Sequence, residues 1–161
     1  MITAELLDKR KKDLIICVLS DSHGSKKKVW ELLNKKKYDY IFFLGDGLSD
    51  MEDFCDDNVK KVSGNCDFWA TEPITQTIAI GKYKFMLTHG HEYKAKHSVF
   101  GLLKPATENG CNVVCFGHTH KQLFEQIEGV YFINPGSFKN NDFAEIIIED
   151  ENMSVNLKKY E

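Results

Sequence analysis

The sequence predicts an α/β fold in which two β-sheets pack face to face and helices cover the outside. The first half of the chain alternates apolar runs of strand length with a helical pattern, whereas the second half is mainly short strand-like segments. With 161 residues, 42% hydrophobic and 28% charged, the chain suits one domain with a sizeable core. We therefore predict a single domain over residues 14–161, preceded by an N-terminal arm or short helix over residues 1–13.

The segments after the arm predict a β-α-β unit. Residues 14–20 form a continuous apolar run, as expected for a strand covered on both faces. Val29, Leu32 and Leu33 then recur at helical spacing, with lysines on the other side. Residues 40–45 read as a second buried strand, and strands joined through a crossover helix are parallel.

The later segments predict further short elements. Ser49, followed three residues later by Glu52, predicts a capped short helix over residues 49–54. Gly81 and Lys82 read as a hairpin turn between two antiparallel strands. Pro105 is expected to interrupt a mixed helix and loop region over residues 93–109. The other predicted strands are residues 59–64, 112–117, 122–129, 130–137, 144–151 and 154–159.

Composition excludes several classes of protein. A net charge of -3 gives no basic excess, so the lysine runs read as solvated faces and a nucleic-acid partner is not expected. No stretch approaches the length of about 20 apolar residues that spans a bilayer, so we expect a soluble cytoplasmic protein without a membrane partner.

Five cysteines without a C-x-x-C pattern indicate reduced thiols. Trp69 and Phe100 are aromatic residues that could mark a contact surface of a homo-oligomer.

Polar side chains that can bind metals follow nearly every predicted core strand. Since ligands bind at the carboxyl ends of strands in such sheets, we expect these side chains to share one edge. If the chain stays extended after Gly117, His118 and His120 point to the same side, because side chains of a strand repeat every two residues. Isolated turns would not place such residues after so many strands, and the set therefore predicts a metal site formed by Asp21, His23, Asp46, Asn65, His89, His118 and His120.

The ordered motifs D-S-H, G-D, G-N-C-D, H-G-H and G-H-T-H resemble those of the calcineurin-like metallophosphoesterases. Their short spacing and the later segment 131–137 are similar to the small bacterial and archaeal phosphodiesterase branch. The resemblance covers nearly all of the chain from residue 14 and implies a two-metal site on a β-sandwich flanked by helices.

The resemblance also implies roles for these residues. One metal ion would take Asp21, His23 and His120. The other would take Asn65, His89 and His118, and Asp46 would bridge both. Histidine, carboxylate and amide ligands without a thiolate suit manganese, which we favour, or iron, cobalt, nickel or zinc.

Two metals about 3.5 to 4 Å apart activate a bridging hydroxide as nucleophile and clamp the reacting oxygens. Asp46 would hold the metals at this spacing. Asn65 and His118 would contact the phosphoryl oxygens as the catalytic groups, and the expected substrate is a small phosphodiester.

The sequence departs from part of the superfamily at Cys66, where many relatives carry a histidine that is a candidate general acid. A thiol with an ordinary pKa near 8.5 is a poor substitute for a cationic imidazole. Good leaving groups and diesters over monoesters are therefore expected. His91 is read as a partner that orients a ligand, His97 as a surface residue, and Asp67 has no assigned role.

Two alternative functions stay open at the level of sequence. The same fold serves as a non-catalytic protein-interaction subunit of the retromer coat, although that scaffold's relatives lose ligands at D-x-H and G-N positions that Asp21, His23 and Asn65 keep here. A nuclease is the other alternative. Repair nucleases of the superfamily are longer, carry histidine where Cys66 stands, and need a DNA-binding surface.

Overall fold

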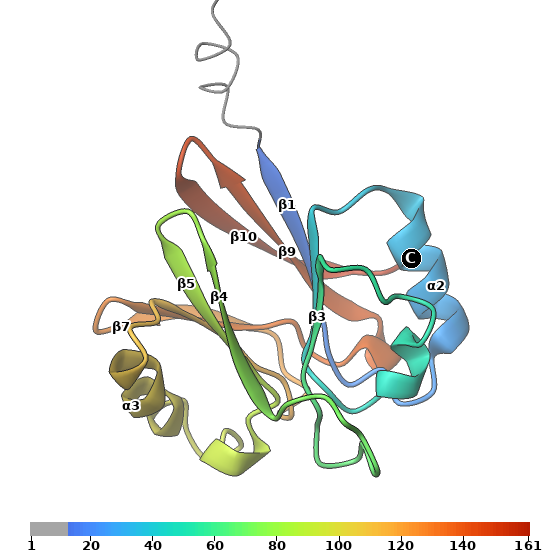
Figure 1. The fold of residues 1–161 in the computed structure, drawn as a ribbon, viewed down its shortest axis with the longest axis horizontal. Helices are drawn as coiled ribbons and strands as arrows, with labels where there is room; N and C mark the ends of the chain where they lie inside the picture. The colour runs from blue at the N-terminus through green and yellow to red at the C-terminus, as the bar shows by residue number, and fades with distance from the viewer. Residues whose placement is uncertain (1–12) are drawn as a thin grey trace, which may run out of the picture.

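The computed structural model describes residues 13–161 and contains two five-stranded sheets that lie face to face (Figure 1). The strand orders are β10-β9-β1-β2-β3 and β4-β5-β6-β8-β7. Helices α2 and α3 lie on opposite sides of this sandwich (Figure 1). The predicted fold class is confirmed, whereas most of the predicted arm, residues 1–12, lies outside the described residues.

The first sheet carries the β-α-β unit that the sequence predicted. Strands β1 and β2 are parallel, with Ile16 opposite Tyr40, and β9 runs antiparallel on the other side of β1. The elements of this half are β1 Leu14–Leu19, α2 Lys26–Lys35, β2 Tyr40–Phe43, η1 Leu48–Met51, β3 Val59–Lys61, η3 Phe138–Asn140, β9 Asp142–Glu149 and β10 Asn152–Lys159.

The second sheet begins with the predicted hairpin and continues with parallel strands. Strands β4 and β5 pair antiparallel around Gly81 and Lys82, and β5, β6 and β8 are parallel neighbours. The elements of this half are β4 Thr75–Ile80, β5 Tyr83–Thr88, η2 His91–Tyr93, α3 Phe100–Glu108, β6 Val113–Cys115, β7 Leu123–Ile127 and β8 Val130–Asn134.

Strand β1 is buried on both faces, and this explains its continuous apolar run. Ile16 and Val18 belong to the core between the sheets, where they join residues such as Phe85. Cys17 and Leu19 point the other way, into the core beneath α2. Because successive side chains of a strand alternate, only an apolar run can fill both cores.

Two local predictions were wrong. The short helix after β2 is the 3-10 turn η1, which begins at Leu48 after Gly47 rather than after a Ser49 cap. The backbone N–H groups of Gly47 and Leu48 are instead bound by a distant carboxylate, that of Asp67. Pro105 lies inside α3 and does not interrupt it, because α3 continues to Glu108. Leu102 and Ala106, one on each side of Pro105 in the sequence, are buried, and their packing stabilises the helix across that position.

No helix within residues 13–161 is both long enough and apolar enough to cross a membrane.

Replacing Phe85 by alanine should cost about 3–5 kcal/mol of unfolding free energy, because it leaves a cavity between the two sheets. Phe85 is fully buried and its ring packs edge-on against Phe42, at 5.4 Å between centroids. Urea denaturation measures the change. The matched control is Phe68→Ala, whose side chain is 79% exposed and should change stability by less than about 0.5 kcal/mol. Equal losses in the two variants would contradict this account of the core.

Candidate metal centre

Six of the seven predicted ligands gather at the carboxyl ends of four strands. Asp21 and His23 follow β1, Asp46 follows β2, His89 follows β5, and His118 and His120 follow β6. Within the described residues they form two groups, in each of which the ligand atoms lie within 4.8 Å of one another. The two groups are Asp21, His23 and His120, and Asp46, His89 and His118.

The first group surrounds the buried carboxylate of Asp21. His120 Nε2 lies 3.0 Å from Asp21 Oδ1, and His23 Nε2 lies 3.6 Å from the same oxygen. His23 Nε2 is buried and has no hydrogen-bond partner. A buried polar nitrogen without a partner costs free energy unless something binds it, and this one faces a carboxylate.

The second group is arranged around the fully buried ring of His89. His89 Nε2 lies 3.2 Å from Asp46 Oδ2 and 3.2 Å from His118 Nδ1. Its other nitrogen, Nδ1, lies 2.7 Å from the carbonyl oxygen of Leu44, which can only accept a hydrogen bond. Nδ1 therefore carries the proton in the neutral ring, whereas the protonated ring also donates from Nε2 to Asp46. Loss of the Nε2 proton frees the lone pair that a metal ion would bind. His89 Nε2 is also 3.9 Å from Asp21 Oδ1, so the two groups adjoin.

Mutual interactions set the pKa values of the second group. Burial raises the pKa of Asp46, but its hydrogen bond and charge interaction with His89 outweigh burial and lower the pKa below its ordinary value. Burial lowers the pKa of His89, and the carboxylates of Asp46 and Asp21 raise it overall. Burial, followed by the positive charges of His89 and Lys96, lowers the pKa of His118 to about 4. His118 is therefore a neutral imidazole at pH 7, the form that binds a metal ion.

The backbone of the ligands is mostly left-handed. Five of the seven predicted ligands have a positive φ, namely Asp21, His23, Asp46, His118 and His120. The expectation that the chain stays extended through His118 and His120 is therefore wrong, since their φ values are 69° and 62°. As a result the two imidazoles do not meet at one point, and each enters a different group. Left-handed conformations are costly for residues other than glycine and persist only where the surroundings impose them.

Two carboxylates impose the conformation of the loops after β1 and β2. Asp67 accepts hydrogen bonds from four backbone N–H groups, those of Asp46 (2.7 Å), Gly47 (2.8 Å), Leu48 (3.0 Å) and Gly64 (2.7 Å). Asp50 accepts hydrogen bonds from the Ser22 hydroxyl (2.5 Å) and from the N–H groups of Gly24 (2.9 Å) and Ser25 (3.2 Å).

Sequence reasoning missed Asp50 and gave Asp67 no role. An acidic residue in a loop carries no local signal of which distant N–H groups it will bind.

The end of β8 and the segment after it support the loops that carry ligands after β6 and β1. Asn134 Nδ2 donates to the carbonyl oxygen of Gly117 at 3.1 Å and to Thr119 Oγ1 at 3.0 Å. The hydroxyl of Ser137 donates to the carbonyl oxygen of Asp21 at 2.8 Å. A side chain at Gly117 would overlap Ser20 Oγ, so glycine is required where the loop after β6 passes the end of β1.

The other singled-out residues lie around the two groups. Asn65 is exposed and its amide lies 3.5 Å from Cys66 Sγ. The N–H of Cys66 donates to Asp46 Oδ1 at 2.8 Å, so Asn65 directly precedes a residue that contacts the second group. The His91 ring lies 5.5 Å from that of His89, between centroids, and its Nδ1 is buried without a hydrogen-bond partner. His97 is exposed, as predicted.

These residues fit divalent metal ions. Each group combines a carboxylate oxygen with two imidazole nitrogens, a donor set that suits transition metals such as manganese, iron or zinc. His89 Nε2 lies close to His118 Nδ1 and to Asp46, so these three side chains can direct lone pairs at one point. His23 Nε2 has no hydrogen-bond partner, so its lone pair is available in the other group. The structure thus contains two adjoining candidate metal-binding groups.

Named relatives agree with this site. A Bacillus subtilis protein named "Probable metallophosphoesterase YsnB" is 29% identical over 77% of this chain and 75% of its own length. A crystal structure of a predicted phosphoesterase from Streptococcus pneumoniae superposes with a TM-score of 0.78 at 26% identity, covering 92% of this chain and 90% of that one.

Two further relatives carry more specific names. The vacuolar protein sorting-associated protein 29 of Schizosaccharomyces pombe is 28% identical over 86% of this chain and 79% of its own length. A phosphodiesterase of Methanocaldococcus jannaschii is 38% identical over 37% of this chain and 32% of its own length.

The model of the calcineurin-like phosphoesterase superfamily domain matches residues 14–149, from β1 to the end of β9. That range contains every residue of both candidate metal-binding groups. The chain therefore belongs to the calcineurin-like phosphoesterase superfamily.

Proposed function

We propose that this protein is a metal-dependent phosphodiesterase that hydrolyses small phosphodiesters. The observation that carries the proposal is the pair of adjoining carboxylate and imidazole groups at one edge of the sandwich, joined through His89 and Asp21. Paired metal sites of this kind catalyse in-line displacement at phosphorus. Membership of the superfamily supports a hydrolase acting on phosphoester bonds.

The proposed metal ligands follow the two groups. Asp21, His23 and His120 would hold one ion, His89, His118 and Asn65 the other, and Asp46 would bridge them. We favour manganese, since carboxylate and imidazole ligands without thiolate suit it, but iron, cobalt, nickel or zinc would also fit. When bound, the two ions would lower the pKa of a water molecule toward neutrality and offset the charge of the phosphate.

The chain's own residues would orient the reaction. Hydrolysis forms a bond from a water oxygen to phosphorus, breaks the bond to the leaving ester oxygen, and delivers a proton to that oxygen. We assign to Asn65, whose exposed amide lies 3.5 Å from Cys66 Sγ, and to His118 contacts with the phosphoryl oxygens. Asp67 would act as a positioning residue, since it binds the backbone N–H of Asp46 and of the glycine before Asn65.

Cys66 supports a preference for good leaving groups. Burial, with the negative charges of Asp46 and Asp67, raises the pKa of its thiol, so the thiol is a weak proton donor at neutral pH. Solvent water would then supply the proton to the leaving oxygen. Diesters with acidic leaving alcohols or phenols are the substrates such a site handles best.

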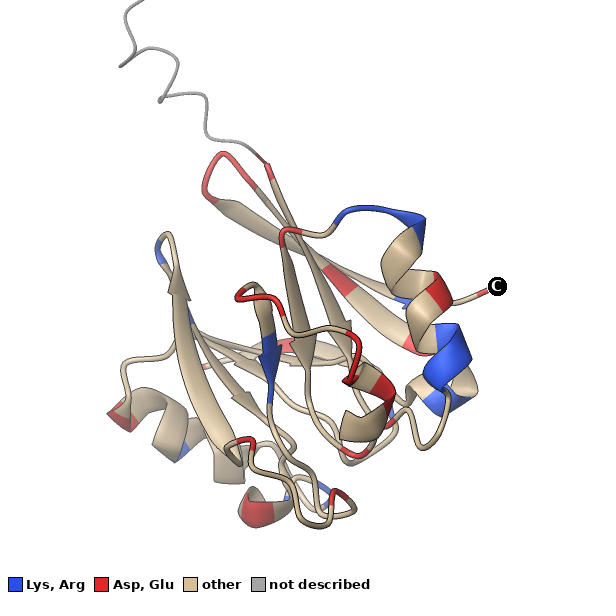
Figure 2. Cartoon of the chain, turned by 45° about the vertical axis from the view of Figure 1, so that its right-hand side comes forward, with Lys and Arg blue, Asp and Glu red and all other residues tan. Residues whose placement is uncertain are grey.

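A nuclease function is supported less well. The lysines at the ends of α2 lie away from α3 (Figure 2), and several are engaged within the protein. Lys26 pairs with Glu52, Lys36 pairs with Glu145 at 2.7 Å, and Lys28 donates to the carbonyl oxygen of Phe138 at 2.9 Å. A DNA-binding face needs cations that are free to meet phosphates.

A scaffold function is the second candidate, because a relative of this chain is named as a vacuolar sorting protein. The complete carboxylate and imidazole set favours catalysis, since a scaffold does not require it. The loss of turnover in a metal-site variant separates the two functions.

Replacing Asp46 by asparagine should lower phosphodiester turnover by more than about 100-fold. Removing a group that only orients a metal ligand lowers activity by about 10- to 100-fold. Removing a ligand that bridges two metal ions should lower activity by more than this. The measurement is hydrolysis of bis(p-nitrophenyl) phosphate by manganese-loaded protein, with metal content by mass spectrometry. Chelation should abolish turnover and added manganese should restore it. Unchanged turnover and metal content in this variant would contradict the bridging role of Asp46, whereas absence of turnover in the metal-loaded wild type would favour a scaffold.

Replacing Asp67 by asparagine should weaken metal affinity by about 10- to 100-fold, because one carboxylate oxygen becomes an amide NH2 that faces backbone N–H groups. Calorimetric titration with manganese measures the affinity directly. Asp57→Asn, a change of the same kind at an exposed position, is the control and should bind manganese normally. Equal affinities for both variants would show that Asp67 does not organise the site.

Replacing Cys66 by histidine should reduce the dependence of rate on the leaving group. General acid catalysis contributes about 10²- to 10⁴-fold, so the rate for a phenol leaving group relative to p-nitrophenol should rise by about 10-fold or more. A series of aryl methyl phosphates measures this dependence in both proteins. If wild type already shows a flat dependence, another residue supplies the proton.

A further inference from the structure

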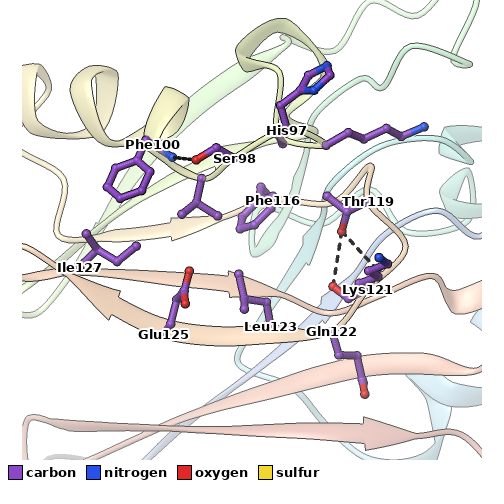
Figure 3. Close-up of a pocket in the computed structure, with 13 residues that line it drawn as sticks. His97, Ser98, Phe100, Phe116, Thr119, Lys121, Gln122, Leu123, Glu125 and Ile127 are labelled. Atoms are coloured by element: carbon purple, nitrogen blue, oxygen red, sulfur yellow. Dashed lines mark hydrogen bonds between the residues drawn. The ribbon is translucent and has the colours of Figure 1, made fainter.

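A groove with a volume of about 750 Å³ lies between β7 and the segment that leads into α3, with Thr119 in its lining (Figure 3). Thr119, which lines the groove, stands in sequence between His118 and His120, one from each metal-binding group. The opposite wall is the segment from Ala95 to Phe100, which leads into α3. Ligand pockets occupy about 300–1,000 Å³, so the groove can take a substantial part of a small substrate.

The floor of the groove combines apolar side chains with one carboxylate. Phe116 is 1% exposed and lines the groove together with Leu123, Glu125 and Ile127, which alternate along β7 and share one face of that strand (Figure 3). Phe100 stands at the edge with its ring 64% exposed, at the first position of α3. An aromatic ring held in water beside an apolar floor can cover the face of another flat group.

Cations lie at the end of the groove that meets the metal centre. Lys96 and Lys121 both line it and are exposed. Lys121 directly follows His120 in the chain, and its N–H donates to Thr119 Oγ1 at 3.2 Å. A phosphodiester carries one negative charge, which the lysines would attract toward the metals.

The wall at Thr119 is rigid. Its hydroxyl oxygen accepts hydrogen bonds from Asn134 Nδ2 at 3.0 Å and from the Lys121 N–H at 3.2 Å. The turn that separates the two histidines is therefore fixed before any substrate arrives. A preformed wall lowers the entropic cost of binding.

We propose that this groove binds one ester arm of the substrate, and that this arm is a flat aromatic group that remains attached to phosphorus in the product. The inference rests on the proposed phosphodiesterase function. The oxygen of the leaving arm gains negative charge as its bond to phosphorus breaks, and water stabilises that charge better than an apolar surface does, so the leaving arm faces solvent. The arm that stays attached to phosphorus can lose its water and pack against Phe116, Leu123 and Phe100.

Three diesters with the same p-nitrophenolate leaving group test the proposal, with phenyl, hexyl or methyl as the retained arm. The value of kcat/KM for the phenyl compound should exceed that for the methyl compound by about tenfold, the scale of one stacking contact. It should also exceed the value for the hexyl compound, which has the same number of carbon atoms. Equal values for phenyl and methyl, or for phenyl and hexyl, would overturn the proposal.

Phe100→Ala should remove most of the preference for phenyl, and Phe100→Tyr, which keeps the ring, should retain it. The matched control is Phe124→Ala on β7, because Phe124 points to the other face of that strand and stacks on Tyr131 at 6.0 Å between centroids. An equal loss of preference in Phe124→Ala, or none in Phe100→Ala, would contradict an arm that lies against Phe100.

A binding measurement separates this inference from the proposed function. Diphenyl phosphate should bind manganese-loaded protein about tenfold more tightly than dimethyl phosphate in calorimetry, and Phe100→Ala should abolish the difference. If this result appears without turnover of any diester, the groove stands and the phosphodiesterase function fails. If diesters turn over but the two probes bind equally, the phosphodiesterase stands and the groove proposal fails.

Discussion

The metal centre depends on carboxylates that bind the backbone of the ligand-bearing loops. Most of the ligands have left-handed backbone conformations, which an isolated chain would avoid. Asp67 and Asp50 offset this cost by binding N–H groups that the sharp turns leave without partners. Because a charged acceptor makes stronger hydrogen bonds than a neutral one, a few such residues can hold two loops in place.

The sheets decide where these loops meet. Strands β1 and β2 are parallel neighbours in one sheet, and β5 and β6 are parallel neighbours in the other. Their carboxyl ends reach the same edge of the sandwich, so residues 21 to 120 contribute to one site although they lie far apart in sequence. The core between the sheets includes Val18, Phe42 and Phe85. Because each ligand group draws residues from both sheets, this core fixes the distances between the ligands within each group. The chemistry of the centre therefore rests on the packing beneath it.

The surroundings of the metal centre differ on its two sides. On one side the loop of Cys66 and Asp67 is occupied with holding Asp46 in place and offers no strong acid. On the other side the turn at Thr119 borders a groove that combines apolar side chains with two lysines and Glu125. This asymmetry would give the two arms of the proposed phosphodiester substrate different environments. Specificity in such an enzyme would come from the groove, because the metal ligands recognise only the phosphate.

The sequence alone determined the strands, the crossover helix, the hairpin and the residue types at the strand ends, since these follow from local periodicity and short motifs. It did not determine the start of η1, the continuity of α3 through Pro105, or the left-handed backbone of His118 and His120, whereas the resemblance of the motifs does assign these two histidines to different metal ions, in agreement with the two groups. Nor could it reveal that Asp50 and Asp67 bind distant N–H groups, or that Phe100 faces a groove beside the centre. Each of these features depends on contacts between segments far apart along the chain, and such contacts exist only once the two sheets have packed.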